Sequence, residues 1–352
     1  MLQTTLGCPQ HVGAVNGEIK MVTSHDVARL AGVSQPTVSR ALRDNPKVSE
    51  ETKQRVRDAA KALGYVLSET GRALSSGRTR RIGLLLTDLD NQFYPHVIAP
   101  MHRELESLGY QLVLQTETSD TGRVAERLLA NGLDGVLLAT TTLDSVLPVR
   151  LRDRGVPFVY FNRTSSAVEA DGAVVDPSGG LREAAETIVE LGHRRIGAIF
   201  GPRNTSTGEH RESVLRDALE DHGIVIGSRY SHRGPFDFDT GYAGAGRLLD
   251  LAERPTVIVC GNDVVALGAL NAARELGLAV PDQVSIVGFD DLPVASWPIV
   301  RLTTVAFDLD AMARAAAGLL VERVEGEPDR PYQTLTFDSH LVRRDTLAAA
   351  SG

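Results

Sequence analysis

The stretch VTSHDVARLAGVSQPTVSRALR, residues 22–43, predicts two short helices joined by a tight turn. Thr23 can cap the first helix, with Asp26 three residues later as the reciprocal half of a capping box. Ser34 can cap the second helix. Pro36 falls in that helix's first turn, where a missing N–H costs little because those donors have no intrahelical partner. The capping and turn signals therefore agree.

The spacing of Ala28, Gly32 and Val38 predicts a helix-turn-helix rather than any helical pair. A small residue lets the second helix cross closely, a glycine permits the left-handed turn, and a buried Val holds the second helix at a steep angle. Such a unit presents the start of its second helix to the major groove of DNA. Because the same spacing can occur in an ordinary helical hairpin, the motif alone favours DNA binding only modestly.

The candidate DNA-binding residues lie at the helix caps and on the exposed face of the second helix. Gln35 and Arg40 can make paired hydrogen bonds to base edges. The set from this stretch is Thr23, Ser34, Gln35, Pro36, Thr37, Ser39 and Arg40.

Charge is distributed unevenly along the 352 residues. The whole chain has a net charge of −8, but residues 21–80 carry 11 Lys and Arg against 6 Asp and Glu, a net charge of +5. Residues 81–352 carry 25 basic and 38 acidic side chains, a net charge of −13. A basic head before an acidic body is typical of a protein whose head binds phosphates and whose body does not.

The composition is that of a globular protein able to bury a large core, since 42% of the residues are hydrophobic and 5% are aromatic. The sequence has no charged segment followed by an apolar run at its start, and no apolar stretch near the ~20 residues of a membrane span. Cys8 and Cys260 are too few for a disulfide framework. We therefore expect a cytoplasmic protein without a membrane partner.

Short polar segments delimit the predicted domains. Residues 1–20 mix Gly, Pro, Gln and Asn without periodicity, and we expect a disordered extension there. Ser49 can cap a third helix that Gly64 stops, which completes a helix-turn-helix headpiece over residues 21–66. Residues 67–80 are rich in Ser and Gly and predict a linker.

From Arg81 onward, apolar strands alternate with amphipathic helices, which predicts an α/β fold with parallel sheets. The pattern restarts after Asp176, so we expect two similar α/β lobes with a chain that recrosses between them. We assign the first lobe to residues 81–176 and 306–333, the second lobe to residues 177–305 and 334–346, and a tail to residues 347–352.

Several runs along the chain occur together, and in this order, in one known family. They are DVARLAGVSQPTVSRAL, RALSSGRTRRIGLLL, LGHRRIG, CGNDVVALGAL, VPDQVSIVGFDD and LTTV, and they fall between residue 22 and about residue 345. In these runs the chain resembles the lactose-repressor (LacI/GalR) family of bacterial transcription regulators. The resemblance implies an all-α headpiece, a hinge over residues 67–80, and a two-lobed core similar to periplasmic sugar-binding proteins, with a small-molecule effector between the lobes.

The resemblance also implies how the protein meets DNA. Family members usually act as homodimers, so two headpieces read two half-sites of a pseudo-palindromic double-stranded operator. Paired hinge helices enter the minor groove and wedge a Leu between base pairs. Leu74 matches that Leu, and Gly71 stands where the family usually has Ala, which should weaken the hinge helix by roughly 1 kcal/mol. Taken without the family, Leu74 is an apolar residue in a linker.

Candidate effector-binding residues carry over from the family position by position. Arg and carboxylate or amide groups can hold adjacent hydroxyls while an aromatic face covers a ring, which suits a sugar or sugar derivative. The candidates are Phe93, Thr207, Arg211, Phe236, Asn262 and Asp290. Several follow predicted strands, where ligands bind in α/β sheets, although Asn or Asp after a strand is also a common helix cap.

Two departures from the family pattern leave a second effector class open. Asn162 stands where many relatives have an acidic residue, and Thr205 stands where purine-responsive members carry Arg. A purine- or nucleoside-responsive regulator is therefore an alternative. Thr205 weighs slightly against that alternative. A further alternative is a sugar-binding module whose headpiece does not repress, but secretory binding proteins carry a signal peptide and lack a helix-turn-helix.

A catalytic function would need a nucleophile–base pair or a metal site. The scattered histidines His25, His96, His193 and His210 show no spacing that suits metal ligation. We therefore expect no enzyme, no metal and no cofactor.

Overall fold

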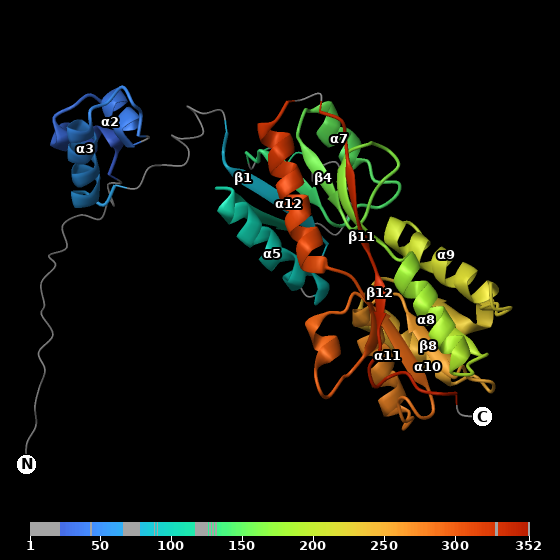
Figure 1. Ribbon diagram of the computed structural model, residues 1–352. Helices are drawn as coiled ribbons and strands as arrows, with labels where there is room; N and C mark the ends of the chain where they lie inside the picture. The colour runs from blue at the N-terminus through green and yellow to red at the C-terminus, as the bar shows by residue number, and fades with distance from the viewer. Residues whose placement is uncertain are drawn as a thin grey trace, which may run out of the picture. The chain divides into compact units, whose positions relative to one another are not determined.

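The computed structural model describes residues 22–42, 44–65, 78–87, 89, 91–116, 126, 128, 130, 132–327 and 330–350. The chain divides into two compact units, Met1–Arg78 and Thr79–Gly352. Figure 1 shows both units and labels some of their helices and strands.

The described residues of the first unit form a headpiece of three helices, α1 (Ser24–Ala31), α2 (Gln35–Leu42) and α3 (Glu50–Ala62). At the start of α1, the Asp26 carboxylate accepts hydrogen bonds from the Thr23 backbone N–H at 3.0 Å and from its hydroxyl at 2.7 Å. Gly32 ends α1 with a φ of 66°, the left-handed turn that the sequence predicts. The Thr37 N–H donates to Ser34 Oγ at 3.4 Å, so Ser34 contributes to the start of α2.

Small and branched apolar side chains form the headpiece core. Val27, Val38, Ala41 and Val56 are almost completely buried where the three helices meet. With Ala28 also buried, α2 can cross close to α1, which leaves the opposite face of α2 on the surface.

The second unit begins with a six-stranded sheet in the order β11-β5-β4-β3-β1-β2, in which every pairing is parallel. Its strands are β1 (Arg81–Leu86), β2 (Gln111–Thr116), β3 (Gly135–Leu138), β4 (Phe158–Phe161), β5 (Asp171–Asp176) and β11 (Thr334–Asp338). Its helices among the described residues are α5 (Phe93–Ser107), α7 (Leu147–Asp153) and α12 (Leu309–Glu325), and α5 and α12 lie side by side on one face (Figure 1). This is the first lobe.

Alternating residues of the first-lobe sheet enter two separate cores. Leu84 and Leu137 pack with α5 and α12, whereas their neighbours Leu85 and Leu138 pack with α7 on the other face. The buried runs of the sequence are therefore strands covered by helices on both faces, as a parallel sheet requires.

The second lobe holds a sheet in the order β12-β10-β9-β8-β6-β7, parallel except for the antiparallel pair of β10 and β12. Its strands are β6 (Ile196–Phe200), β7 (Ser231–Arg233), β8 (Val257–Cys260), β9 (Ser285–Phe289), β10 (Thr303–Ala306) and β12 (His340–Val342). Its helices are α8 (Ser178–Glu190), α9 (Ser206–Glu220), α10 (Phe238–Leu249) and α11 (Asp263–Glu275), with short 3-10 turns η1 (Ser228–Tyr230) and η2 (Pro293–Ser296). The pair α8 and α9 covers one face and α10 with α11 covers the other (Figure 1).

The chain crosses between the lobes after β5, between β10 and α12, and between β11 and β12. The sequence assignment of residues 334–338 to the second lobe was wrong, because β11 pairs in parallel with β5 at the edge of the first-lobe sheet. Ala306, assigned to the first lobe, instead ends β10 in the second. The expected tail is also wrong for residues 347–350, since Leu347 is buried and the Ala350 N–H donates to the Leu191 carbonyl of the second lobe.

Predictions for residues 1–20 and for Gly71 and Leu74 lie outside the described residues. In the part of the chain that the structure describes, no helix is both long and apolar enough to cross a membrane.

Candidate functional site

The described headpiece places the candidate DNA-binding side chains on its surface. Thr23, Ser34, Pro36 and Arg40 are exposed, and Gln35, Thr37 and Ser39 are partly exposed, while Val38 between them points into the core. Gln35 Nε2 donates to Ser24 Oγ at 3.3 Å, which links the start of α2 to the start of α1. The face can therefore meet a partner along α2, with Gln35 held by one weak hydrogen bond.

A cleft between the two lobes brings all six candidate effector-binding residues together. Its lining residues are Asn91, Phe93, Tyr94, Ala139, Asn162, Arg163, Thr207, Arg211, Phe236, Asn262 and Asp290. They come from loops and helix starts that follow the carboxyl ends of parallel strands in both sheets, where ligands bind in open α/β folds.

A buried ion pair between Arg211 and Asp290 lies on the second-lobe side of the cleft. Arg211 Nη2 donates to Asp290 Oδ1 at 2.9 Å and Nη1 donates to the Gly261 carbonyl at 2.8 Å. The exposed fractions of the two side chains are 8% and 2%. Burial raises the pKa of Asp290 to about 6, although Arg211 pulls it down.

The guanidinium of Arg211 is also packed against an aromatic ring. The Arg211 Cζ atom lies 3.6 Å from the centroid of the Phe289 ring, and this cation–π contact helps to hold the side chain in place. Arg211 Nε is buried without a hydrogen-bond partner among the described residues. One donor of Arg211 is thus left for a ligand.

Two residues in this region act as helix caps. Asn262 Oδ1 accepts from the Val265 N–H at 2.9 Å at the start of α11, and Asn262 also lines the cleft. The Asn262 amide nitrogen is thus the part of the side chain left for a ligand. Thr205 Oγ1 accepts from the Gly208 N–H at 3.1 Å and donates to the Pro202 carbonyl at 2.9 Å, so Thr205 serves α9 as a cap.

The ring of Phe236 fits against glycine backbone. A Cβ atom added to Gly201 would lie 2.1 Å from Phe236 Cζ, far inside contact distance. Gly201 directly follows β6, so the absence of a side chain there makes room for the aromatic wall of the cleft.

Five lining residues were not among the sequence candidates, namely Asn91, Tyr94, Ala139, Asn162 and Arg163. Asn162 and Arg163 follow β4 directly, so the position after a strand was a usable signal for both. Asn162 has a φ of 61°, and its Oδ1 is buried without a partner among the described residues, as is Thr207 Oγ1. Asn91 and Tyr94 lie at the start of α5 and carried no comparable signal.

Hydrogen bonds join the lobes across the cleft. Asn91 Nδ2 of the first lobe donates to the Phe236 carbonyl of the second at 2.9 Å. The Thr164 N–H donates to Ser206 Oγ at 2.9 Å, and the Leu143 N–H donates to the Asn204 carbonyl at 2.8 Å. The described conformation is therefore one in which the lobes touch.

The cleft itself is narrow, and a larger side cavity adjoins it. The volume of the cleft is about 30 Å³, which is small for a ligand-binding site. The adjoining side cavity has a volume of about 230 Å³ and shares Asn162, Thr207 and Arg211 with the cleft. Asp176 and His210 also line the side cavity, so a ligand larger than water has room on that side.

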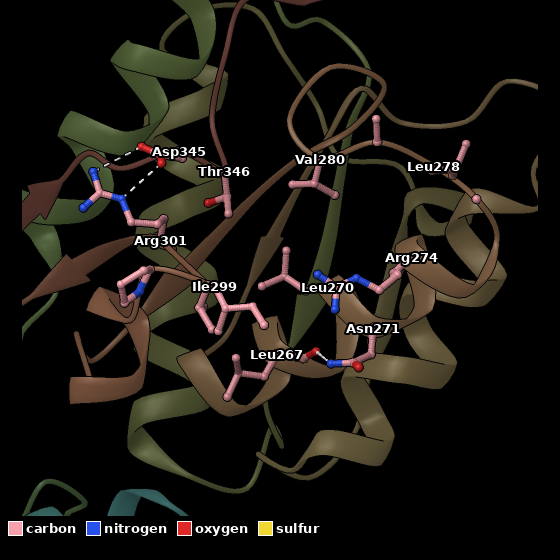
Figure 2. A pocket seen from close by; sticks show the side chains of 14 residues that line it. Leu267, Leu270, Asn271, Arg274, Leu278, Val280, Ile299, Arg301, Asp345 and Thr346 are labelled. Carbon is pink, nitrogen blue, oxygen red and sulfur yellow. Dashed lines mark hydrogen bonds and ion pairs between the residues drawn. The ribbon is translucent and has the colours of Figure 1, made fainter.

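A second, separate pocket of about 580 Å³ lies on the surface of the second lobe. Figure 2 shows it between Leu267, Leu270 and Arg274 of α11 and the segment that carries Ile299. Arg301 donates to Asp345 through Nε at 3.0 Å at one end of the pocket. We call this pocket the α11 groove.

Metal ions in proteins are held by donor sets of His, Cys, Asp and Glu side chains. The described residues include no group of three such side chains that could hold a metal ion. His193, one of the histidines weighed for ligation, is buried and contacts Thr256 Oγ1 at 2.8 Å and the Ala348 carbonyl at 2.9 Å. Its role is to hold the end of the chain on the second lobe.

Comparison with family models matches both units. Residues 23–68 match the model described as bacterial regulatory proteins, lacI family. Residues 185–347 match the model of a periplasmic binding protein-like domain.

Individual relatives extend the match over almost the whole chain. The HTH-type transcriptional regulator CelR of Thermobifida fusca is 34% identical over 329 residues, which cover 91% of this chain and 96% of CelR. The HTH-type transcriptional repressor PurR of Pectobacterium carotovorum is 33% identical over 334 residues, which cover 93% of this chain and 97% of PurR.

Two solved structures show the same architecture. A transcriptional regulator CelR–cellobiose complex has 32% sequence identity and a TM-score of 0.70, with 93% of this chain and 100% of that chain covered. The lac repressor dimer bound to operator and the anti-inducer ONPF has 25% identity and a TM-score of 0.83, with 94% and 100% covered.

Proposed function

This chain belongs to the lacI family of bacterial regulatory proteins, and on that premise we propose that it is a repressor whose operator affinity is set by a sugar or sugar derivative bound between the lobes. Membership of the family makes it a DNA-binding transcriptional regulator and not an enzyme. The repression, the effector class and the residues that carry them are the proposal.

The main support for a sugar or sugar derivative as effector is a set of polar atoms in the cleft that have no hydrogen-bond partner among the described residues. Asn162 Oδ1, Thr207 Oγ1 and Arg211 Nε are buried, and none has a hydrogen-bond partner in the described part of the chain. An unpaired buried polar group costs roughly 1–3 kcal/mol. A polyol offers donors and acceptors at adjacent carbons, and Phe236 offers an aromatic face for its ring.

A purine or nucleoside is the second candidate, because relatives named PurR cover 93% of this chain. Phe93 and Phe236 both line the cleft, and a flat base could stack on either ring. Thr205 weighs against this candidate, since its hydroxyl already accepts from the Gly208 N–H at the start of α9 and donates to the Pro202 carbonyl. A sugar is also supported by the relative that was solved as a complex with cellobiose.

We propose that the base-reading contacts come from Gln35 and Arg40, with Ser34, Thr37 and Ser39 on the same face. Arg40 is exposed on α2, where its guanidinium can reach a guanine edge. Leu74 lies outside the described residues, and we propose from the sequence that it wedges into the minor groove. Leu74→Ala should then weaken binding to the operator far more than binding to random DNA.

We propose that the protein binds a pseudo-palindromic operator as a homodimer. The lac repressor, which has the same architecture, was solved as a dimer bound to operator. The α11 groove is the surface we assign to the second copy, because Ile299 and Trp297 beside it are 76% and 56% exposed. Large apolar side chains so exposed are often covered by a partner. Ile299→Asp should give monomers in sedimentation equilibrium, and Val225→Asp, at a site 71% exposed, should not. A dimer unchanged by Ile299→Asp would place the contact elsewhere.

A thermal-shift screen of sugars and nucleosides tests the effector class. A cleft ligand stabilises the folded protein by mass action, by about 2.7 kcal/mol at 100 times its Kd. A sugar should raise the melting temperature of the wild type and fail to do so for Asp290→Ala, which should still bind DNA. A nucleoside that stabilises the protein when no sugar does would replace the proposal by its alternative.

A further inference from the structure

We propose, on the basis of the sugar-binding cleft proposed above, that the effector carries an acidic group, a carboxylate or a phosphate, and that Arg163 and Arg211 hold this group between the lobes. The neutral, hydroxyl-bearing part of the ligand would occupy the side cavity.

Arg163 is the cation in the cleft that lacks a counter-ion. Its guanidinium carbon lies 5.7 Å from the centroid of the Phe236 ring, and that of Arg211 lies 5.8 Å from the same centroid. No carboxylate in the described residues has an oxygen within 4.0 Å of an Arg163 nitrogen, the limit for an ion pair. Arg163 lies near the ligand position without being neutralised there.

The charges that line the cleft do not balance. The described lining residues include two guanidinium groups and one carboxylate, and Arg211 already occupies that carboxylate at 2.9 Å. Burial lowers the pKa of Arg163, and repulsion by Arg211 lowers it further, against the attraction of Asp290. A guanidinium nevertheless stays charged at neutral pH. Arg163 is partly buried, and charges removed from water in proteins are normally paired, so the site favours a ligand that brings a negative charge.

The free donors suit a group with more than one acceptor oxygen. Arg211 Nε has no partner among the described residues, and the Arg163 guanidinium is free of any described ion pair. A carboxylate or phosphate can give one oxygen to each guanidinium, whereas a single hydroxyl leaves the charge of both uncompensated. Charge-assisted hydrogen bonds are also about twice as strong as neutral ones.

The two arginines come from different lobes. Arg163 follows β4 of the first lobe, and Arg211 lies in α9 of the second. An anion between them would therefore add an attraction across the cleft to the direct hydrogen bond from Asn91 to the Phe236 carbonyl. Beyond Arg211, the side cavity offers Asp176 and Ser206 as acceptors for hydroxyls, so the site has a cationic end and an acceptor end.

Matched ligands test the acidic group on the full-length protein. D-glucuronate differs from D-glucose by a carboxylate in place of a hydroxymethyl group, and inorganic phosphate probes the anion site alone. At equal ionic strength, calorimetry should show glucuronate bound roughly tenfold more tightly than glucose. Phosphate should raise the melting temperature of the wild type.

Variants of Arg163 identify the residue responsible. Arg163→Gln should abolish the preference for glucuronate and the stabilisation by phosphate, and Arg163→Lys should keep part of both because it retains the charge. Arg150→Gln removes an exposed Arg of α7 in the same lobe and should behave as the wild type. Circular dichroism of each variant checks that it is folded.

The outcomes separate this proposal from the proposed sugar cleft. Equal affinity for glucuronate and glucose, or a preference that survives Arg163→Gln, overturns the acidic group and leaves the sugar effector standing. If phosphate binds in a way that depends on Arg163 and no sugar binds, the proposal of an acidic group is supported and the proposal of a sugar effector is overturned. If neither phosphate nor any sugar binds, both proposals fall.

Discussion

Asp290→Asn should stabilise the core at neutral pH, although it removes one partner of a buried ion pair. Burial raises the pKa of Asp290 from 3.8 to about 6 in spite of Arg211, so desolvation of the carboxylate outweighs its attraction to the guanidinium. Each pKa unit corresponds to about 1.4 kcal/mol, and the ionised carboxylate therefore costs the folded state about 3 kcal/mol. Asn has the same shape without the charge, and it tolerates the positive φ of 113° at this position.

The pH dependence gives the sign of the effect. Because the folded-state pKa of Asp290 lies above its unfolded value, the folded state binds more protons. Wild-type stability from this group is fully present below about pH 4 and is lost as the pH rises through about 6. Asp290→Asn has no carboxylate to ionise at this position, so its stability does not fall for this reason as the pH rises. The two proteins should have similar free energies of unfolding near pH 4 and differ by up to about 3 kcal/mol above pH 7.

Urea unfolding between pH 4 and pH 8 measures this difference, and a second Asp provides the control. Hydrogen bonds from Ser178 lower the pKa of Asp176, and the Ser178 N–H donates to Asp176 Oδ1 at 2.9 Å. Asp176→Asn should therefore destabilise the protein at pH 7, opposite in sign to Asp290→Asn. If Asp290→Asn were instead less stable than the wild type at pH 7, the attraction of Arg211 would exceed the desolvation cost and the reasoning would be wrong.

Three further changes have expected outcomes. Gly201→Ala should displace the Phe236 ring and weaken effector affinity in calorimetry, whereas Gly246→Ala, where an added Cβ meets nothing within 4 Å, should leave affinity unchanged and stabilise α10 by up to about 1 kcal/mol. Arg40→Ala should cost about 1–3 kcal/mol and relax specificity at one base pair per half-site, and an equal loss on all sequences in a mobility-shift assay would make Arg40 a phosphate contact instead. Gly71→Ala, outside the described residues, should tighten operator binding by up to roughly 1 kcal/mol per hinge and blunt the effector response; unaltered affinities with and without effector would rule out a hinge that folds on DNA.

Local signals in the sequence were sufficient for the headpiece and for most of the α/β core. The caps at Thr23 and Ser49, and the left-handed Gly32, depend only on neighbouring residues, so the sequence shows them directly. Strands β5 and β7 lie at or next to a sheet edge and include polar residues, and their pairing depends on partners far along the chain. The wrong lobe for residues 334–338 follows from the same cause, because β11 needs β5 as its neighbour.

The cleft could be predicted only in part. Some cleft residues directly follow a buried strand, as Asp290 follows β9, and this position can be recognised in the sequence as a place where ligands bind. The unpaired charge of Arg163 and the hydrogen bond from Asn91 to Phe236 depend on how the two lobes meet. A local sequence pattern cannot predict how the lobes contact each other, because the residues involved are up to 145 positions apart.

The central claim is that a ligand in the cleft changes the affinity of the headpiece for a specific DNA sequence. It is tested most directly by fluorescence anisotropy of a duplex that the protein itself selects from a random library, with and without a ligand found in the thermal-shift screen. The ligand should change operator affinity about 5- to 150-fold in the wild type and leave that of Asp290→Ala unchanged. A protein that selects no sequence, or whose operator affinity is the same with the cleft saturated, would contradict the account.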